Sequence, residues 1–336
     1  MKIKISKAEE LVTMALKAKV VPMIHGSPAI GKSAVVHGIA KKFNLKLIDL
    51  RLSQCDPTDL LGFPSVVAGR AGYMPMSTFP IEGDALPEGY SGWLLFLDEF
   101  NSASVEVQAS AYKLVLDRMV GTHCLHKNVA IVTAGNLDTD GAIVNPMSTA
   151  LQSRLVHLEA EVDLKWWLDW ADAKQFDSRI GSYLNFRPDH IYTFKPDHTD
   201  KTYASPRTWE FVNKLLSVTD IDRQSLPLFA GALGEGVARE FMGFCQIHEK
   251  LPKMETILNF PETAPMPVEP ASQFALCGAI SGSIDKSNCE RVLQYIKRMP
   301  AEFQVVTLRR SAKRQPTILA NEQFGKWLAE TAADLI

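Results

Sequence analysis

One short stretch of the sequence has the spacing of a phosphate-binding loop. It follows the pattern G-x-x-x-x-G-K-S and comprises Gly26, Ser27, Pro28, Ala29, Ile30, Gly31, Lys32 and Ser33. Glycines let such a loop curl so that successive backbone N–H groups face an anion. A lysine in this place reaches the β- and γ-phosphates of a nucleotide, and the hydroxyl after it is a ligand for Mg²⁺. We therefore predict that this loop binds ATP together with Mg²⁺.

Two adjacent carboxylates form a second candidate site. Asp98 and Glu99 follow four consecutive apolar residues in the stretch LLFLDEF. Enzymes with a phosphate loop keep an acidic residue for the metal at the end of a buried strand. We predict that Asp98 holds Mg²⁺, directly or through water, and that Glu99 orients and polarises the water that attacks the γ-phosphate. A solvated strand end without catalytic function is the alternative interpretation of this pair.

A parallel sheet would bring these residues together. Apolar runs typical of buried strands occupy residues 20–24, 45–52, 92–98, 129–136 and 154–160. Helical patterns precede the first run and lie after the first and the third. Alternating helices and fully apolar strands predict an α/β fold with a parallel sheet and helices on both faces. The phosphate loop would then join the first strand to the helix that follows it.

Changes in composition along the chain predict three regions. Residues 1–160 would form an αβα nucleotide-binding core, interrupted at residues 55–92 by a Pro- and Gly-rich insertion with a hairpin that turns near Gly69 and Arg70. Residues 161–250 read as helices, and we expect them to form an α-helical lid. Residues 251–336 would form a proline-rich connection and a C-terminal helical region.

The overall composition is that of a globular protein with more than one core. Of its 336 residues, 46% are hydrophobic and 22% are charged. The 36 Lys and Arg residues balance 38 Asp and Glu residues, so net charge does not favour binding to nucleic acid. The first residues, MKIKISKAEEL, lack the apolar core of a signal peptide, and no run of about 18 apolar residues could span a membrane. We therefore expect a cytoplasmic protein without a membrane partner.

The order of the motifs resembles that of AAA+ ATPases. After the phosphate loop and the Asp-Glu pair, Asn136 ends an apolar strand in VTAGN, Arg154 stands in NPMSTALQSRL and Arg207 stands in ASPRTW. By this resemblance, Asn136 is the sensor 1 residue, which acts with Glu99 on the water or the γ-phosphate. Arg154 is the arginine finger that enters the site of a neighbouring subunit. Arg207 is the sensor 2 arginine, carried on the lid.

Three further stretches resemble the MoxR group, which shares features with the dynein-related and McrB-like ATPases. DPTDLLGFP, followed by a Gly-centred hairpin and MSTFP, resembles the insertion in that group's second core helix. LDRMVGTH before VAIVTAGN resembles its pre-sensor 1 hairpin, and SPR resembles the start of its sensor 2 helix. The similarity covers about residues 8–215. The sequence departs from the family pattern at Ser153, where aspartate is usual, and at Leu155, where phenylalanine is usual.

The resemblance implies an ATPase that works as a homo-oligomeric ring, most often a hexamer, with one nucleotide site at each interface. The ring would remodel or activate a protein client, in this group often with a von Willebrand factor A-domain partner. A finger supplied by a neighbour contributes about 10³ to 10⁵ in rate, so a single subunit would be a poor ATPase.

Several alternatives remain open. Arg118 is the second candidate for the finger, or else a charge on a solvated helix face. The hairpin at residues 69–72, with Arg70 and Tyr73, and a second one near Gly121 could contact a client, or the first could be a long surface loop. A nucleic-acid motor or loader, McrB-like or accessory to replication, would use the hairpins and the basic run LRRSAKRQ at 308–315, which is otherwise a solvated face or an interface. A scaffold that uses ATP for assembly alone is the third interpretation of function.

Overall fold

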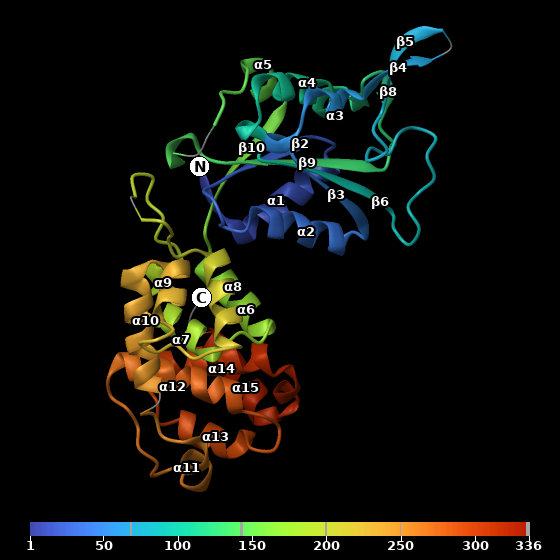
Figure 1. The fold of residues 1–336 in the computed structure, drawn as a ribbon. Helices are drawn as coiled ribbons and strands as arrows, with labels where there is room; N and C mark the ends of the chain where they lie inside the picture. The colour runs from blue at the N-terminus through green and yellow to red at the C-terminus, as the bar shows by residue number, and fades with distance from the viewer. Residues whose placement is uncertain (68, 142–143, 199, 249, 334–336) are drawn as a thin grey trace. The chain divides into compact units, whose positions relative to one another are not determined.

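The chain folds into two compact units. The computed structural model describes residues 1–67, 69–141, 144–198, 200–248 and 250–333. Unit 1 comprises Met1–Asp163 and Lys195–Asp197, and unit 2 comprises Leu164–Phe194 and His198–Ile336. The described elements of unit 1 are a sheet with helices and two hairpins, whereas those of unit 2 are all helices (Figure 1).

Six strands form the central sheet of unit 1, and all neighbouring pairs are parallel. In spatial order they are β1 (Lys2–Lys4), β10 (Leu155–Glu161), β2 (Val21–His25), β9 (Val129–Gly135), β6 (Gly92–Asp98) and β3 (Leu45–Arg51). The predicted α/β fold with a parallel sheet is confirmed, and all five predicted strands are present. The structure adds β1, a short edge strand whose sequence, Lys-Ile-Lys, carries no apolar run that could have predicted it.

Helices cover both faces of this sheet, which explains why its central strands are almost entirely apolar. Every residue of β6 before Asp98 is buried. In Figure 1, α1 (Ile5–Lys17) and α2 (Lys32–Lys42) lie on one face, and α3 (Pro57–Leu61), α4 (Val105–Leu116) and α5 (Thr149–Gln152) lie on the other. Leu95 of β6 and Ala111 of α4 belong to one apolar core on the second face.

An antiparallel hairpin projects from unit 1 at the place where the sequence predicts one (Figure 1). Its strands are β4 (Phe63–Val67) and β5 (Arg70–Met74), paired from Phe63 opposite Met74 to Val67 opposite Arg70. Gly69 adopts a φ of 76°, which suits a turn, while Ala68 lies outside the described residues. Arg70 and Tyr73 are exposed, and their contact with a client stays a prediction.

A second hairpin and several short 3₁₀ turns complete unit 1. The hairpin turns at Gly121, as expected, and pairs its two short strands in antiparallel orientation. These elements are β7 (Met119–Val120), β8 (His123–Cys124), η1 (Leu52–Gln54), η2 (Phe100–Ser102) and η3 (Asp138–Asp140).

Unit 2 is an assembly of helices that come from the sequence before and after residue 250. Its longer helices are α6 (Leu164–Ala173), α7 (Ser178–Phe186), α8 (Pro206–Leu216), α9 (Leu226–Leu233), α10 (Glu235–His248), α11 (Met254–Asn259), α12 (Pro270–Ser283), α13 (Cys289–Ile296), α14 (Ala301–Arg314) and α15 (Glu322–Ala333). The 3₁₀ turn η4 (Pro188–Ile191) lies between α7 and α8, and η5 (Pro316–Ala320) lies between α14 and α15. Helix α12 packs against both α7 and α14, so segments from the predicted lid and the predicted C-terminal region share one unit. None of the described helices combines the length and apolarity needed to cross a membrane.

Candidate functional site

The predicted phosphate loop, residues 26–33, follows β2, and its last two residues, Lys32 and Ser33, begin α2. Because the sheet is parallel, the carboxyl ends of β2, β9 and β6 meet at one edge, where α/β proteins bind their ligands. Strand β9 lies between the other two, so Asn136 stands between the loop and Asp98. The loop packs closely on the sheet, since a Cβ on Gly26 would lie 2.8 Å from the carbonyl oxygen of Ala160.

Lys32 connects the loop to the end of β9. Its Nζ donates to the carbonyl oxygens of Gly26 and Ser27, the latter at 3.2 Å, and to Oδ1 of Asn136 at 3.1 Å. The side chain is buried, and a buried ammonium is tolerated only when oxygen acceptors surround it. All three of these acceptors are neutral, and they hold the ammonium group of Lys32 at the loop, where a positive charge attracts an anion.

Ser33 and Asp98 form a pair of oxygen donors suited to a divalent cation. Ser33 lies in the first turn of α2, and its Oγ donates to Oδ2 of Asp98 at 3.1 Å. The other oxygen of Asp98 accepts from the backbone N–H of Glu99 at 2.8 Å. Hydroxyl and carboxylate oxygens are the ligands that Mg²⁺ prefers. The residues present therefore fit the predicted Mg²⁺ site.

Glu99 points to a different partner. Its backbone is left-handed, with φ 54° and ψ 35°, a conformation that side chains with a Cβ adopt rarely. Its Oε2 accepts a hydrogen bond from the hydroxyl of Ser53, in the turn η1 that follows β3. The two neighbouring carboxylates thus have separate contacts, as their predicted roles require. Sequence reasoning missed Ser53, although it stands shortly after a strand that pairs with the one ending in Asp98.

A second residue missed from the sequence is Asn101, whose side chain holds the backbone of Asn136. Oδ1 of Asn101 accepts from Asn136 N at 3.0 Å, and its Nδ2 donates to Asn136 O at 2.8 Å. The only signal in the sequence is an amide two residues after Glu99. Asn136 therefore has a fixed backbone, while its side chain faces Lys32.

A buried carboxylate lies beside the phosphate loop. Ser27 Oγ donates to Oδ1 of Asp140 at 3.1 Å, and Asp140 is 8% exposed. Within the described part of the chain, its Oδ2 is buried and has no hydrogen-bond partner. A negative charge in this place opposes the binding of phosphate to the loop, because Coulomb repulsion is weakly screened in buried surroundings. The sequence showed no pattern that linked Asp140 to the loop.

Two histidines connect the loop to α5. His25, the last residue of β2, stacks on His157 of β10 with ring centroids 5.1 Å apart, and Nε2 of His25 lies 2.8 Å from Nδ1 of His157. Burial, followed by the electrostatic effect of His157, lowers the pKa of His25 to about 4. His157 Nε2 in turn donates to the carbonyl oxygen of Gln152 at 2.8 Å. Polar contacts thus run from the start of the loop to the helix that precedes Arg154.

Arg154 itself contacts its own surroundings. Its Nη1 donates to the carbonyl oxygen of Ala150 at 2.6 Å and to Ser153 Oγ at 3.1 Å, and its guanidinium lies 5.0 Å from the ring centroid of Tyr112. The side chain is exposed. None of these described contacts is with the phosphate loop of the same chain, so the role of Arg154 in a neighbouring site stays a prediction.

The rival finger candidate, Arg118, has a structural contact. Its Nη2 donates to the carbonyl oxygens of His126 and Val129, and its backbone φ is 55°. Val129 begins β9, at the edge of the sheet opposite the phosphate loop. These bonds tie the second hairpin to β9. Arg118 is therefore not a charge on a solvated helix face, which was one interpretation of the sequence.

Arg207 belongs to unit 2. It follows Pro206 in the first turn of α8, where Ser205 caps the helix by accepting from the backbone N–H of Thr208 at 3.2 Å. The cap and the proline explain why the helix begins here. The side chain of Arg207 is exposed, and its action on the nucleotide stays a prediction.

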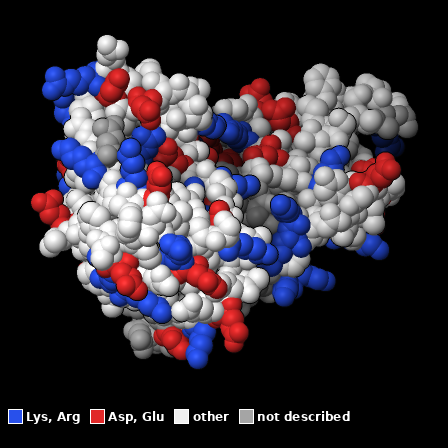
Figure 2. All heavy atoms as spheres, turned by 90° about the horizontal axis from the view of Figure 1, so that it is seen from below, with Lys and Arg blue, Asp and Glu red and all other residues white. Residues whose placement is uncertain are grey.

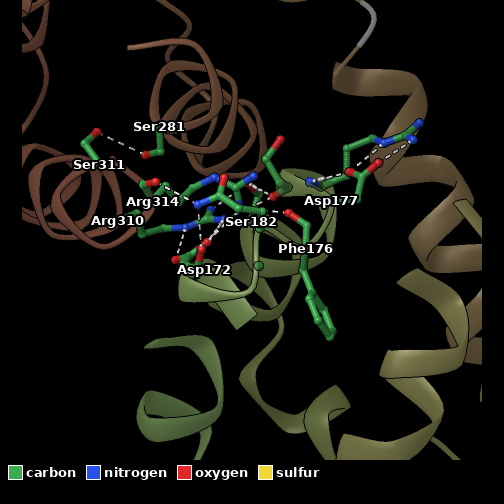
Figure 3. Close-up of polar contacts among 12 residues, drawn as sticks. Asp172, Phe176, Asp177, Ser182, Ser281, Arg310, Ser311 and Arg314 are labelled. Carbon is green, nitrogen blue, oxygen red and sulfur yellow. Dashed lines mark hydrogen bonds and ion pairs between the residues drawn. The ribbon is translucent and has the colours of Figure 1, made fainter. Parts of the chain in front are cut away.

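The basic run at 308–315 pairs with α6 inside unit 2 (Figure 3). Arg310 donates to both carboxylate oxygens of Asp172, at 3.0 and 3.1 Å, and Arg314 donates to Oδ1 of Asp172 at 3.1 Å. Arg309 donates to Asp169 at 2.6 Å. Arg310 and Asp172 are 5% and 4% exposed. The expectation of a solvated face is therefore wrong for this run, because most of its charges join two helices of the same unit.

Comparisons with known proteins give distant structural similarity. No protein-family model matches the sequence, and no curated protein sequence matches it. Among solved structures, NtrX from Brucella abortus is similar at 13% identity with a TM-score of 0.38, over 96% of this chain and 67% of that one. Two mutants of RuvB from Thermotoga maritima are similar at 16% identity with TM-scores of 0.39, over 76% and 77% of this chain and 75% and 76% of theirs. The fold is established by the strand order and register themselves.

Proposed function

We propose that this chain is a cytoplasmic AAA+ ATPase of the MoxR type. The observation that carries the proposal is the assembly at the carboxyl ends of three neighbouring strands, where Lys32 contacts Asn136 and Ser33 contacts Asp98. Phosphoryl transfer needs a cation at the phosphates, oxygen ligands for a metal and a separate group for the attacking water. The site has a residue of each kind, and Glu99 is the separate group.

In this mechanism Lys32 and the N–H groups of the loop bind the phosphates of ATP. Ser33 and Asp98 would hold Mg²⁺, which when bound neutralises charge that develops on the phosphates. Glu99 orients a water molecule and accepts its proton while the water oxygen bonds to the γ-phosphorus. The bond from that phosphorus to the bridging oxygen of ADP breaks, and ADP leaves with the electron pair.

Two variants test the separate roles of binding and hydrolysis. Lys32→Ala removes the cation at the phosphates and should abolish ATP binding. Glu99→Gln keeps the shape and the metal ligands but cannot accept a proton, so it should bind ATP normally and stop turnover. Binding is measured by calorimetry and turnover by phosphate release. An equal loss of binding in both variants would contradict the separate roles of Lys32 and Glu99.

The proposal includes a homo-oligomeric ring, as a hexamer, that acts on a protein client. Arg154 would complete the site of a neighbouring subunit, and Arg207 would contact the γ-phosphate from the lid. Support comes from the exposed side chain of Arg154 and from its described contacts with Ala150, Ser153 and Tyr112, none of which belongs to the loop of its own chain. A client with a von Willebrand factor A-domain partner belongs to the same proposal.

The nucleic-acid alternative receives no support from the basic run on which it depended, because Arg309, Arg310 and Arg314 are paired with aspartates. Basic and acidic side chains are also interspersed over the face shown in Figure 2. Exposed tryptophans could stack on the bases of a nucleic acid. Trp167 and Trp170 of α6 instead pack within the protein, since both contact the ring of Phe176.

A further inference from the structure

Asn101 links the two segments that carry Glu99 and Asn136. It lies in the turn η2, two residues beyond Glu99, and its side chain crosses to the chain that leaves β9. Its amide makes a reciprocal pair of hydrogen bonds with the backbone of Asn136, at 3.0 Å and 2.8 Å. The side-chain amide of Asn101 thus bonds to both the N–H and the carbonyl oxygen of Asn136, as a residue of a neighbouring strand would in a sheet.

This contact is tightly enclosed. Asn101 is 2% exposed, and a Cβ on Gly135 would lie only 2.2 Å from Oδ1 of Asn101, so the preceding residue must be glycine. The backbone of Asn101 is held from the other side, because its carbonyl oxygen accepts from Asn145 N at 2.7 Å. Asn145 Nδ2 donates to the carbonyl oxygen of Ala103 at 2.8 Å. The segment after Glu99 and the segment after β9 are therefore joined at several points.

The two hydrogen bonds from Asn101 to the backbone of Asn136 determine where the side chain of Asn136 lies. Asn136 follows the last residue of β9, and beyond that residue the sheet no longer fixes its backbone. Its Oδ1 nevertheless reaches Nζ of Lys32 at 3.1 Å. Displacement of a positioned group by about 1 Å can reduce the rate of a reaction by about 100-fold. A residue that fixes the backbone of Asn136 thereby controls a group close to the reacting phosphate.

We propose that Asn101 is a positioning residue for ATP hydrolysis, which acts by holding Asn136 between Lys32 and the substrate. This inference rests on the proposed function. The hydrogen bonds of its side-chain amide are with the backbone of Asn136, so Asn101 is placed to act on the reaction through Asn136. Its effect on turnover must therefore pass through Asn136, and this separates it from a residue that only stabilises the fold.

The test is a double-mutant cycle with Asn101→Ala, Asn136→Ala and the two combined. Asn101→Ala should lower kcat by about 10- to 100-fold and leave the affinity for ATP unchanged, because the loop and Lys32 remain. The double variant should be no slower than Asn136→Ala alone, since the first substitution has no other route to the reaction. The control is Asn128→Ala, which removes a side-chain bond to the carbonyl oxygen of Ser91 before the opposite end of β9 and should not change kcat.

A second variant keeps the test valid if Asn101→Ala fails to fold. Asn101→Ser is smaller and uncharged, and its hydroxyl cannot bond to both the N–H and the carbonyl oxygen of Asn136 as the amide does. It should fold and show the same selective loss of kcat. Thermal melting verifies folding for every variant before the kinetics are compared.

The outcomes separate the inference from the function on which it rests. An inactive wild-type protein would contradict the proposed ATPase, and with it the role of Asn101. An active wild type with undiminished kcat in both folded Asn101 variants would contradict the role of Asn101 alone. Losses that add fully in the double variant would do the same, because they would show a route that bypasses Asn136.

Discussion

The residues at the carboxyl edge of the sheet differ in the charges that they bring to a phosphate. Lys32 attracts it, whereas Asp140 lies buried next to Ser27 with one oxygen that accepts no hydrogen bond from any described residue. The carboxylate must weaken the binding of nucleotide, since it places a negative charge beside the loop. On the proposed function, Asp140 would therefore lower the affinity of the site for nucleotide below the value that the loop alone would give.

Asp140→Asn should therefore tighten ATP binding. The amide keeps an acceptor for Ser27 and removes the charge, which in partly buried surroundings corresponds to about 5- to 10-fold in affinity. Calorimetric titration with ATP measures the change. Asp138→Asn is the matched control, because Asp138 lies on the same turn but is exposed and screened by solvent. Weaker binding by Asp140→Asn would show that the carboxylate assists the nucleotide.

The stability of the protein should depend on the protonation of His25. Its pKa in the folded protein is about 4, below the ordinary value of 6.5, because burial and His157 disfavour the charged ring. Between these values the unfolded chain binds a proton that the folded protein does not. The contribution of neutral His25 to the free energy of unfolding is therefore fully present above pH 6.5 and is lost as the pH falls to about 4.

Urea unfolding at a series of pH values between about 3.5 and 7.5, a range that includes both pKa values, measures this contribution. His25→Gln should flatten the fall in stability at low pH, whereas His37→Gln, on the exposed surface, should not. Parallel curves for wild type and His25→Gln would mean that His25 does not titrate as described.

At the scale of elements, the joint between α6 and α14 rests on one buried carboxylate with two arginines. Removing Asp172 would leave Arg310 and Arg314 close together without a counter-charge. Asp172→Ala should therefore destabilise the protein by about 3–5 kcal/mol, as expected when a buried ion pair loses one partner. Denaturant unfolding measures the loss.

The control is Asp169→Ala, which breaks the more exposed pair with Arg309 in the same joint and should cost at most about 1 kcal/mol. Arg310→Met should cost less than Asp172→Ala, because Arg314 still neutralises Asp172. Equal losses for Asp169→Ala and Asp172→Ala would show that burial of the pair does not matter.

The sequence predicted those elements whose signal is local. Apolar runs marked five of the six strands, most clearly the inner ones, because strands covered on both faces are continuously apolar. The loop motif marked Lys32, and polar residues at strand ends marked Asp98 and Asn136. Strand β1 was missed because its lysines are exposed. The basic run was misread because its partner Asp172 lies 138 residues before Arg310, a distance that no local pattern spans.

The same reason explains the missing site residues. Ser53, Asn101 and Asp140 act through partners on other strand ends, so only the strand order shows which residues they meet. A polar residue in a turn has many ordinary interpretations until its neighbours across the sheet are known. The residues of the candidate site that belong to local motifs were therefore predictable, whereas those that act through contacts between different strands were not.

At the scale of the whole molecule, mixing two inactive variants tests whether the arginine finger acts between subunits of the proposed ring. Arg154→Ala lacks the finger and Glu99→Gln lacks the base, so each ring alone should be inactive. In a mixture, an Arg154→Ala subunit keeps its Glu99 and receives the finger of a Glu99→Gln neighbour, so some turnover should return. A mixture as inactive as its components would contradict a finger in trans.

Light scattering on Glu99→Gln gives the state of assembly directly. ATP with Mg²⁺ should shift the mass from one subunit, 37.2 kDa, to that of a hexamer, because bound ATP persists without hydrolysis. A mass that stays at one subunit would contradict a ring formed by this chain alone.

The strand order also has a consequence for biosynthesis. Met23, just before the loop, pairs with Thr133 of β9, and Val21 pairs with Leu155 of β10. While a ribosome makes the chain, the loop therefore emerges long before the strands that flank it. Contacts so distant in sequence form slowly, and until about residue 160 has left the ribosome the nascent chain carries the nucleotide motif without a nucleotide site. On the proposed function, the chain would thus respond to ATP only after the whole sheet has been synthesised.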